Sequence, residues 1–394
     1  MISDFHKYQA QTTPHPLGLQ VDFARGSYIY DTTGNAHLDF VAGVSASILG
    51  HCHPAVVEAI QKQTERYLHV MVYGEYAQAP AVKFSKMLAE LLPIPQASTY
   101  MVNSGTEAIE GAMKLARRFT GKKQILAAKN AYHGNTMGSM SLMSLKERSR
   151  VFEPLIPEID FIKFNDFESI EKITEQTAGV VLETIQGGAG FIEPKPGFLN
   201  QVKMKCEKTG SLLILDEIQT GFGRTGKLFG FENFNVIPDI LVVGKGMAGG
   251  LPCGAFIANR KIMKSLSHEP MMGHITTFGG NAVVAAAALA TLKEVRQPQL
   301  QQGCLKKEHL IREKLKHPLI KEVRGRGLML ALIMDSAETA NELVLKAKSK
   351  GLILFWLLFE KKAVRITPPL NISEKEIYKA CTIIHGCLDE INSA

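Results

Sequence analysis

Short apolar stretches recur through the middle of the chain, and most end at a glycine or a small polar residue. Seven of them are rich in aliphatic and β-branched residues: TYMV (99–102), QILAA (124–128), DFIKF (160–164), GVVLE (179–183), SLLIL (211–215), DILVV (239–243) and GAFIA (254–258). Several are almost continuously apolar, which is typical of strands buried on both faces. Helical spacing appears between some of them, as at Ile109, Ala112 and Ala116. This alternation predicts an α/β fold with a mostly parallel central sheet covered by helices.

The two ends of the chain follow other patterns. Residues 27–40, SYIYDTTGNAHLDF, alternate β-formers around a Gly-Asn turn and predict a hairpin. Past Asn281, the Ala-rich stretch AVVAAAALATL predicts a buried helix. Three strand-like runs follow, VRGRGLMLALIM, GLILFWLLF and AVRITPPL, of which we interpret the second as a core strand. A final helix is predicted from Ser373, because Glu376 gives the spacing of a capping box.

These patterns predict a division of the chain into domains. We expect residues 51–288 to form the large domain around the parallel sheet. Residues 1–50 and 289–394 would together form a smaller α+β domain, with the N-terminal hairpin completing it.

Composition and charge narrow the class of protein. The formal net charge of +7 suits an anionic ligand, while no dense basic run with interleaved aromatic residues indicates a nucleic acid. The chain starts without the regions of a signal peptide, and its apolar runs are too short to span a bilayer. Six scattered cysteines without a CxxC pair fit reduced thiols, so we expect a cytoplasmic protein.

The candidate chemistry lies at the ends of two predicted strands. Asp216 ends one strand, and Lys245 follows another within LVVGKGMAGG. The lysine of a P-loop would instead end the glycine loop and precede Ser or Thr. In a parallel sheet both side chains open into the crevice beyond the strand ends. A lysine and a carboxylate placed together suit pyridoxal 5′-phosphate. Each alone also fits an ordinary role, as a loop charge or as a helix cap.

A seat for the phosphate is predicted at NSGTEAIE, where a strand gives way to a helix. The backbone N–H groups of Gly105 and Thr106, with the hydroxyls of Ser104 and Thr106, offer donors to a dianion. The same stretch also fits a helix cap without a ligand. Tyr132 in AYHGNTMG offers a ring to stack on a cofactor, or a residue of the core.

Five stretches, in order along the chain, resemble the class III aminotransferases, which are pyridoxal-phosphate enzymes of fold type I. They are LGHCHPAVVEAI, VNSGTEAIEGAMKLAR, LLILDEIQTGFGRTG, PDILVVGKGMAGGLPCGAFIA and TTFGGNAV. The resemblance extends from about residue 14 to about residue 373. It implies a homodimer of amino acid metabolism that moves an amino group to a 2-oxo acid in two half-reactions, with ping-pong kinetics.

The resemblance also implies roles for single residues. Lys245 would be the Schiff-base lysine, with a pKa lowered by partial burial, and Asp216 would pair with the pyridine nitrogen. Arg365 would bind a substrate carboxylate. The other implied positions are Gln219 at the ring hydroxyl, Ser104, Gly105 and Thr106 at the phosphate, Tyr132 and His133 at the ring, Thr277 at the phosphate of the neighbouring subunit, and Glu183 and Glu217 as supporting residues.

Two positions depart from the ornithine and acetylornithine enzymes of this family. Those enzymes carry an arginine after HG that holds the α-carboxylate of the donor, and this chain has Asn135 there. They also carry a glutamate in IQGE that neutralises the carboxylate-binding arginine, and this chain has Gly188. We therefore expect an ω-amino acid, amine or amino acid donor other than ornithine, with 2-oxoglutarate or pyruvate as acceptor.

Other functions remain as alternatives. An aminomutase or racemase would use the same lysine and aspartate but would need no 2-oxo acid, and a non-enzymatic pyridoxal-phosphate-binding protein is more remote. A nucleotide-binding oxidoreductase would need GxGxxG at the start of a helix after an early strand, and this sequence lacks it. A zinc site at His51, Cys52 and His53 would require adjacent side chains to converge, so no metal is expected.

Overall fold

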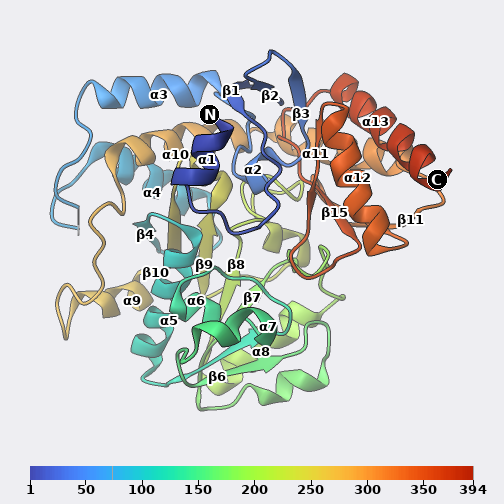
Figure 1. Cartoon of the computed structure of the whole chain (residues 1–394). Coiled ribbons are helices and arrows are strands. Elements are labelled where there is room, and N and C mark those ends of the chain that lie inside the picture. Colours follow the sequence, from blue (N-terminus) through green and yellow to red (C-terminus); the bar gives the residue numbers. More distant parts are fainter. Residues whose placement is uncertain (73, 394) are drawn as a thin grey trace.

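A seven-stranded sheet forms the centre of the molecule (Figure 1), for which the computed structural model describes residues 1–72 and 74–393. In spatial order its strands are β4 (Ala97–Val102), β10 (Gly254–Asn259), β9 (Ile240–Gly244), β8 (Leu212–Asp216), β7 (Thr177–Glu183), β5 (Gln124–Ala128) and β6 (Ile159–Ile162). β10 is antiparallel to both of its neighbours, and the other pairs are parallel. All seven predicted strands and the mostly parallel sheet are confirmed.

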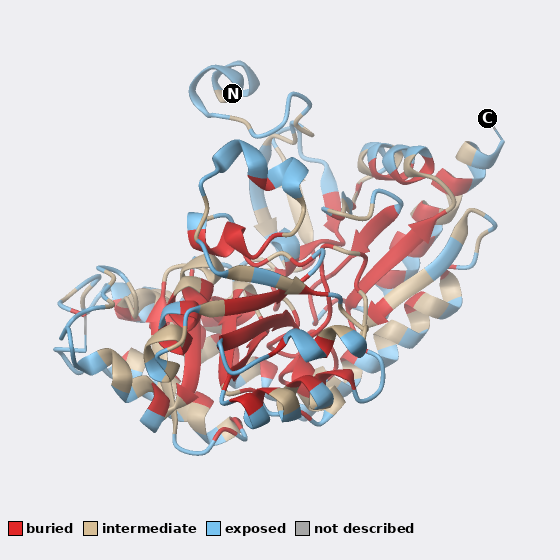
Figure 2. Ribbon diagram, turned by 90° about the horizontal axis from the view of Figure 1, so that it is seen from below, coloured by how far each residue is buried: buried red, intermediate tan, exposed pale blue. Residues whose placement is uncertain are grey.

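Both faces of this sheet are buried, because successive residues of a strand alternate between two hydrophobic cores. In β7, Val181 packs into the core beneath α5 (Gly105–Thr120), whereas Leu182 joins the core that includes α8 (Phe198–Thr209). In Figure 2 the strands of the sheet are accordingly buried, and the outward faces of the surrounding helices are exposed. Burial on both sides explains why these strands read as continuous apolar runs.

Helix α5 forms where its sequence predicts it. The Ser104 hydroxyl caps its N-terminus by accepting a hydrogen bond from the Glu107 amide at 3.2 Å. Its C-terminus stops at Gly121, which has a φ of 72° and thus adopts the left-handed conformation that glycine allows at low cost. Residues between these caps bury an apolar face against the sheet. The start of α5 therefore lies at a fixed place beyond the end of β4.

The N-terminal segment contributes to a small sheet of its own. Its strands, in spatial order, are β1 (Val21–Arg25), β2 (Tyr28–Asp31), β3 (Ala36–Asp39) and β13 (Leu352–Ile353). β2 and β3 form the predicted hairpin, which is confirmed. β3 also pairs in parallel with β13, with Leu38 opposite Leu352. The first strands of the chain therefore lie beside its C-terminal elements (Figure 1).

A four-stranded antiparallel sheet forms most of the C-terminal region. Its strands are β11 (Ile320–Arg326), β12 (Met329–Met334), β15 (Ala363–Ile366) and β14 (Phe355–Trp356). The accompanying helices are α11 (Pro298–Lys314), α12 (Ala337–Ser349) and α13 (Glu374–Asn392). α12 packs on this sheet and on α13. α13 begins with the predicted capping box of Ser373 and Glu376, which is confirmed.

The prediction of one core strand over GLILFWLLF is wrong. The run contains two separate two-residue strands, β13 and β14, which belong to different sheets. Phe355 is 39% exposed, and Trp356 is half-buried. Both line the cavity described below, so their apolar character serves the wall of a pocket and not the interior of a sheet.

The remaining helices surround the large sheet or lie in connections. They are α1 (Ile2–Tyr8), α2 (Ala42–Ser45), α3 (Pro54–Thr64), α4 (Ala79–Leu91), α6 (Met137–Ser141), α7 (Lys146–Ser149), α9 (Arg260–Met263) and α10 (Ala282–Val295). Short 3₁₀ turns are η1 (Arg150–Phe152), η2 (Glu168–Lys172), η3 (Gly230–Phe234), η4 (Lys245–Ala248) and η5 (Lys264–Ser267). The Ala-rich helix α10 is buried against α3 and α4, as predicted. Within the described ranges, every helix is too short or too polar to cross a membrane.

Candidate active site

A cavity of about 420 Å³ opens at the carboxyl ends of the parallel strands. Glu183 and Asp216 are the last residues of β7 and β8, and Lys245 directly follows β9. All three side chains line this cavity. The predicted meeting of Asp216 and Lys245 in the crevice beyond the strand ends is therefore confirmed.

Lys245 lies between the sheet and Arg365, in a strained backbone conformation with a φ of 43°. Burial, and next the positive charge of Arg365, lower the pKa of Lys245 to about 8, although Asp216 and Glu183 act in the opposite direction. The predicted lowering of this pKa is confirmed. A substantial fraction of Lys245 is thus neutral near pH 8, which an amine needs in order to attack a carbonyl group or to accept a proton.

Asp216 is held in place by two hydrogen bonds. Its Oδ2 lies 2.7 Å from Nδ1 of the fully buried His133, and its Oδ1 accepts a hydrogen bond from the Ile218 amide at 2.9 Å. Burial opposes the protonation of His133, but the hydrogen bond and charge of Asp216 outweigh it and raise the pKa of His133. The pair fixes the aspartate carboxylate at the floor of the cavity.

Glu183 supports the neighbouring loops. Its carboxylate accepts hydrogen bonds from the amides of Gly187 at 2.9 Å and Tyr132 at 3.2 Å. Burial raises the pKa of Glu183 to about 7, and the charge of His133 partly opposes that rise. Tyr132 itself is half-buried and lines the cavity, where the sequence placed an aromatic ring. Glu183 therefore positions the backbone that carries this ring.

Glu217 lies outside the cavity, although it follows Asp216 in the chain. Its carboxylate accepts hydrogen bonds from the hydroxyl of Thr220 at 2.7 Å and from the amides of Gly230 and Phe231 at 2.7 and 2.8 Å. Thr184 donates a further hydrogen bond. Burial raises the pKa of Glu217 to about 7. This residue therefore links the end of β8 to the start of η3.

The N-terminus of α5 opens into the cavity through Gly105 and Thr106. The first N–H groups of a helix have no partner within it, and together with the helix dipole they attract an anion. The two predicted hydroxyls are already used within the protein. Ser104 caps the helix, and the Thr106 Oγ1 lies 2.6 Å from Ser139 Oγ and 2.9 Å from Thr136 Oγ1. The backbone of this turn is thus the main candidate seat for a phosphate.

One wall of the cavity is a turn of left-handed helix, α2. Its residues Ala42, Gly43, Val44 and Ser45 have φ values of 50°, 57°, 59° and 70°. This conformation is costly for residues other than glycine. Asp39 stabilises it by accepting hydrogen bonds from the Val41 and Ala42 amides, each at 2.9 Å. The sequence analysis missed this turn, and the small residues of AGVSAS are the only local sign of it.

Gln219 is held by the same turn. Its Nε2 donates a hydrogen bond to Ser45 Oγ at 3.3 Å, and both Gln219 and Val44 line the cavity. Gln219 therefore lines the same cavity as Asp216 and Lys245, and its predicted contact with the ring hydroxyl of the cofactor stays a prediction.

Arg365 enters the cavity from the C-terminal sheet. It lies on β15, is 5% exposed, and stacks over the Phe191 ring with its Cζ 5.6 Å from the ring centroid. Burial lowers the pKa of Arg365 to about 10, so the guanidinium stays charged at neutral pH. Among the described residues, its Nε and Nη1 atoms have no hydrogen-bond partner. A substrate carboxylate would give this guanidinium a charged hydrogen-bond acceptor.

The wall around Arg365 is apolar, and sequence reasoning missed it. The lining residues on this side are Ile185, Phe355, Trp356 and Leu358. The signal was present in the run GLILFWLLF, whose aromatic residues are unusual for a strand covered on both sides.

Thr277 does not line this cavity. It is exposed in the connection before α10. Its neighbour Thr276 accepts a hydrogen bond from Asn103 Nδ2 at 2.8 Å, which ties this connection to the turn before α5. The predicted contact of Thr277 with the phosphate of a neighbouring subunit stays a prediction.

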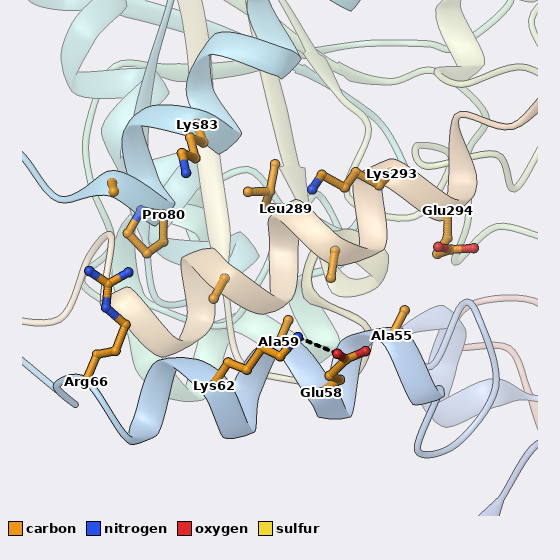
Figure 3. A pocket seen from close by; sticks show the side chains of 13 residues that line it. Ala55, Glu58, Ala59, Lys62, Arg66, Pro80, Lys83, Leu289, Lys293 and Glu294 are labelled. Atoms are coloured by element: carbon orange, nitrogen blue, oxygen red, sulfur yellow. Dashed lines mark hydrogen bonds and ion pairs between the residues drawn. The ribbon is translucent and has the colours of Figure 1, made fainter.

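A second hollow, of about 430 Å³, lies on the outside between α3, α4 and α10 (Figure 3). Apolar residues such as Ala59 and Leu289 line it, together with the basic residues Lys62, Arg66, Lys83 and Lys293. Lys62 is paired with Glu58 at 2.5 Å. No buried carboxylate or histidine lines this hollow among the described residues. Of these two hollows, as far as the described residues show, the first alone carries a lysine together with a buried aspartate and histidine suited to covalent chemistry.

The histidines of HCH have structural partners. His51 Nε2 lies 2.9 Å from Asp39 Oδ2, and His53 directly precedes Pro54 at the start of α3. Across residues 1–72 and 74–393, no three His, Cys, Asp or Glu side chains are grouped as metal ligands.

Comparison with known proteins identifies the family. The model of the class-III aminotransferases matches residues 8–388. The chain therefore belongs to this family, and the resemblance found in its motifs is confirmed. It is a pyridoxal-phosphate-dependent aminotransferase of fold type I, which transfers an amino group from an amino donor to a 2-oxo acid.

Individual relatives are similar over almost the whole chain. The acetylornithine aminotransferase of Caldanaerobacter subterraneus is 39% identical over 380 residues, covering 93% of each chain. That of Methanopyrus kandleri is 38% identical and covers 90% of each chain. Among solved structures, the ornithine aminotransferase from Toxoplasma gondii is 30% identical, with a TM-score of 0.91, and the match covers 99% of this chain and 94% of the other.

Proposed function

We propose that this aminotransferase takes its amino group from an ω-amino acid, an amine or an amino acid other than ornithine. The acceptor is 2-oxoglutarate or pyruvate, and the two half-reactions follow each other in a ping-pong scheme. The observation that carries this proposal is the convergence of Lys245, Asp216 and Arg365 on one cavity. A nucleophilic amine, an anchored carboxylate and an open guanidinium are the groups that such a transfer requires.

The residues of the cavity fit the cofactor. Pyridoxal 5′-phosphate, when bound, withdraws electrons from the substrate and makes its Cα–H bond acidic. Lys245 would bind the cofactor covalently and then move the proton between substrate and cofactor. Asp216, fixed by His133, would hold the ring nitrogen in its protonated form. The amides of Gly105 and Thr106 would hold the phosphate at the start of α5.

The remaining contacts complete the proposed site. Tyr132 would cover one face of the ring, and Gln219 would bind the ring hydroxyl. Glu183 would support them through the Tyr132 amide. Arg365 would bind a substrate carboxylate through its guanidinium, which lines the cavity and has no acidic partner among the described residues.

The residue at the edge of the cavity argues against ornithine as the donor. Asn135 is exposed there and carries no charge, so it offers an α-carboxylate only a neutral partner. Charge-assisted hydrogen bonds are roughly twice as strong as neutral ones. A donor whose carboxylate must be held at this edge therefore binds less well than in relatives with an arginine.

We also infer a homodimer. Exposed apolar side chains gather where two connections meet: Leu68 is 61% exposed, Met71 46% and Phe278 57%. The two connections touch, because Asn281 Nδ2 donates to the Leu68 carbonyl at 2.9 Å and the His69 and Phe278 rings lie 5.0 Å apart. An apolar surface of this kind is typical of a protein interface. Light scattering after size-exclusion chromatography should give twice the mass of the chain, and a monomer would contradict the inference.

A cytoplasmic location is proposed with it. All six cysteines are free thiols, and five of them are buried. Reduced thiols are typical of a reducing compartment.

A panel of amines and amino acids tests the proposed donors. The yellow holoenzyme is mixed with each compound in the absence of a 2-oxo acid, and the loss of its aldehyde-form absorbance is followed. Accepted donors should bleach it, and pyruvate or 2-oxoglutarate should restore it. The Lys245→Ala variant should lose turnover by at least about ten-thousandfold.

Several results would contradict the proposal. Turnover without any 2-oxo acid would favour an aminomutase or racemase. Initial rates showing that both substrates bind together would exclude ping-pong kinetics. Fast turnover of ornithine that survives Asn135→Ala would overturn the doubt about that donor.

A further inference from the structure

The charge of Arg365 is not balanced by any acidic side chain of the described chain. Of the buried carboxylates nearest to it in the cavity, Asp216 is bonded to His133 and to the Ile218 amide, and Glu183 to the amides of Gly187 and Tyr132. No ion pair of Arg365 exists among the described residues. A buried guanidinium with unpaired N–H groups is costly for the protein, so the cavity is prepared for an anion.

The position where an acidic side chain would reach Arg365 is filled by an aromatic ring. A Cβ atom added to Gly188 would lie 2.8 Å from the Phe359 ring, closer than such atoms approach. The Phe359 amide donates to the Gly188 carbonyl at 3.0 Å, which holds the two residues together. A side chain at 188 would therefore have to displace the Phe359 ring before it could extend towards Arg365. The guanidinium stays open whichever substrate is bound.

Among the described residues of this chain, the lining offers no second cation for a second carboxylate. The other basic groups there are Lys245, which serves the cofactor, and His133, which is bonded to Asp216. Arg148 lies outside, exposed at the rim, with its guanidinium 5.4 Å from the Phe359 ring centroid and its Nη2 donating to the Leu358 carbonyl at 2.9 Å. Its position gives a second carboxylate only a solvent-screened partner.

The rest of the substrate side is apolar. Val44, Ile185, Phe355, Trp356 and Leu358 line it. A second carboxylate or an ammonium group placed among them would lose water without gaining a partner, whereas an aliphatic or aromatic group would be favoured.

We propose that the substrates of this enzyme carry one carboxylate, which Arg365 binds in both half-reactions, and an apolar remainder that packs against Trp356, Phe355 and Leu358. The acceptor is then a monocarboxylic 2-oxo acid of the pyruvate type, and the donor is a monocarboxylic amino acid. This inference rests on the proposed function, because it assigns the substrate class of the same cavity.

Trp356 provides a direct measurement of binding. It is the only tryptophan of the chain and lines the cavity. The holoenzyme is titrated with pentanoate and with glutarate at constant ionic strength, and the fluorescence of Trp356 is recorded. These two acids have the same chain length, differ only by the second carboxylate, and cannot react. Pentanoate should bind with a Kd at least about tenfold lower than that of glutarate. Equal or tighter binding of glutarate would overturn the inference.

Three variants test which residues cause the difference in affinity between pentanoate and glutarate. Arg365→Gln should raise the Kd of pentanoate at least about tenfold, since a charged hydrogen-bond partner is lost. Arg365→Lys keeps a buried positive charge, so its Kd for pentanoate should lie between the values of Arg365→Gln and the unchanged protein. This variant replaces Arg365→Gln in the test if that protein folds poorly. Asn135→Arg should lower the Kd of glutarate relative to that of pentanoate by roughly tenfold, because it adds a cation to the lining of the cavity.

Arg148→Gln is the matched control. Removing this rim cation should leave the ratio of the two Kd values unchanged. A selective loss of glutarate binding in Arg148→Gln would make the rim a second carboxylate site and overturn the inference. Because neither ligand reacts, tight pentanoate binding in an enzyme that fails to transfer amino groups would contradict the proposed function alone.

Discussion

The two walls of the active-site cavity are assembled in different ways. The cofactor wall consists of Gly105, Thr106, His133, Asp216 and Lys245. The substrate wall consists of Val44, Gly188, Phe355, Trp356 and Arg365. Every residue of the cofactor wall either ends a strand of the seven-stranded sheet, as Asp216 does, or lies in the segment that follows one. The substrate wall is contributed by α2, the connection after β7, β14 and β15, which are far apart in the sequence.

The walls also differ in how their charges are balanced. On the cofactor wall, Asp216 and His133 form a buried pair, and Lys245 has carboxylates beside it. On the substrate wall, the guanidinium of Arg365 stacks over the Phe191 ring and has no acidic partner among the described residues, and the nearby charge of Lys245 has the same sign. Under the proposed roles, the cofactor wall would be preorganised for one invariant ligand. The substrate wall would be complete only when a carboxylate binds, so we propose that substrate choice is set there.

The largest expected effect concerns the anchored carboxylate of the cofactor wall. Asp216→Asn keeps the shape of the side chain but removes its charge. It should lower kcat roughly a thousandfold, because a preorganised charge at the reacting group is lost. The pKa of His133, which Asp216 raises, should fall in the same variant and can be followed by NMR.

Asp239→Asn is the matched control for this variant. Asp239 precedes β9 and is bonded to Lys203 at 2.6 Å and to the Leu213 amide at 2.8 Å, outside the cavity. This variant should lose stability without losing kcat. Equal losses of kcat in both variants would show that Asp216 acts through the fold and not on the cofactor.

The contrast between the walls explains what the sequence could predict. Asp216, Lys245 and the start of α5 were predictable, because a strand followed by a loop residue or a helix cap is a local pattern, and parallel strands bring their ends together. Val44 and Trp356 were not, because the left-handed turn held by Asp39 has no familiar sequence pattern, and the break in the strand at Trp356 depends on pairing with β15. The division into domains at residues 50 and 288 stays a prediction.

The next effect concerns the stability of the cofactor-free protein. The pKa of Lys245 is lowered from 10.5 to about 8, so folding is penalised whenever this amine is charged. The unfolded chain binds the proton more tightly, so the penalty is full below pH 8 and disappears as the pH rises to 10.5. Lys245→Met should therefore raise the free energy of unfolding by about 3 kcal/mol at pH 7. Urea unfolding at pH 7 and pH 10 (roughly the top of this window) measures both values. If Lys245→Met raises the free energy of unfolding equally at pH 7 and pH 10, the pKa of Lys245 is not lowered by folding.

A smaller effect should appear on the substrate wall at Gly188. Gly188→Ala places a methyl group 2.8 Å from the Phe359 ring and should cost about 2 kcal/mol of stability through overpacking. Phe359→Leu should recover more than half of that cost in the double variant, because the smaller side chain makes room. Denaturant unfolding of the two single variants and the double variant gives the coupling energy. Additive losses would mean that the ring does not exclude a side chain at 188.

The smallest expected effect tests the strain in α2. Val44 has a φ of 59°, where alanine is strained and glycine is not. Val44→Ala removes two methyl groups and keeps a Cβ atom at this φ, whereas Val44→Gly removes the whole side chain and with it the strain, so the glycine variant should be more stable by about 1 kcal/mol. At Val82, which is 54% exposed in the right-handed helix α4, the order should reverse by about 1 kcal/mol. If alanine is the more stable substitution at both positions, the turn is not strained, and the substrate wall owes its shape to packing alone.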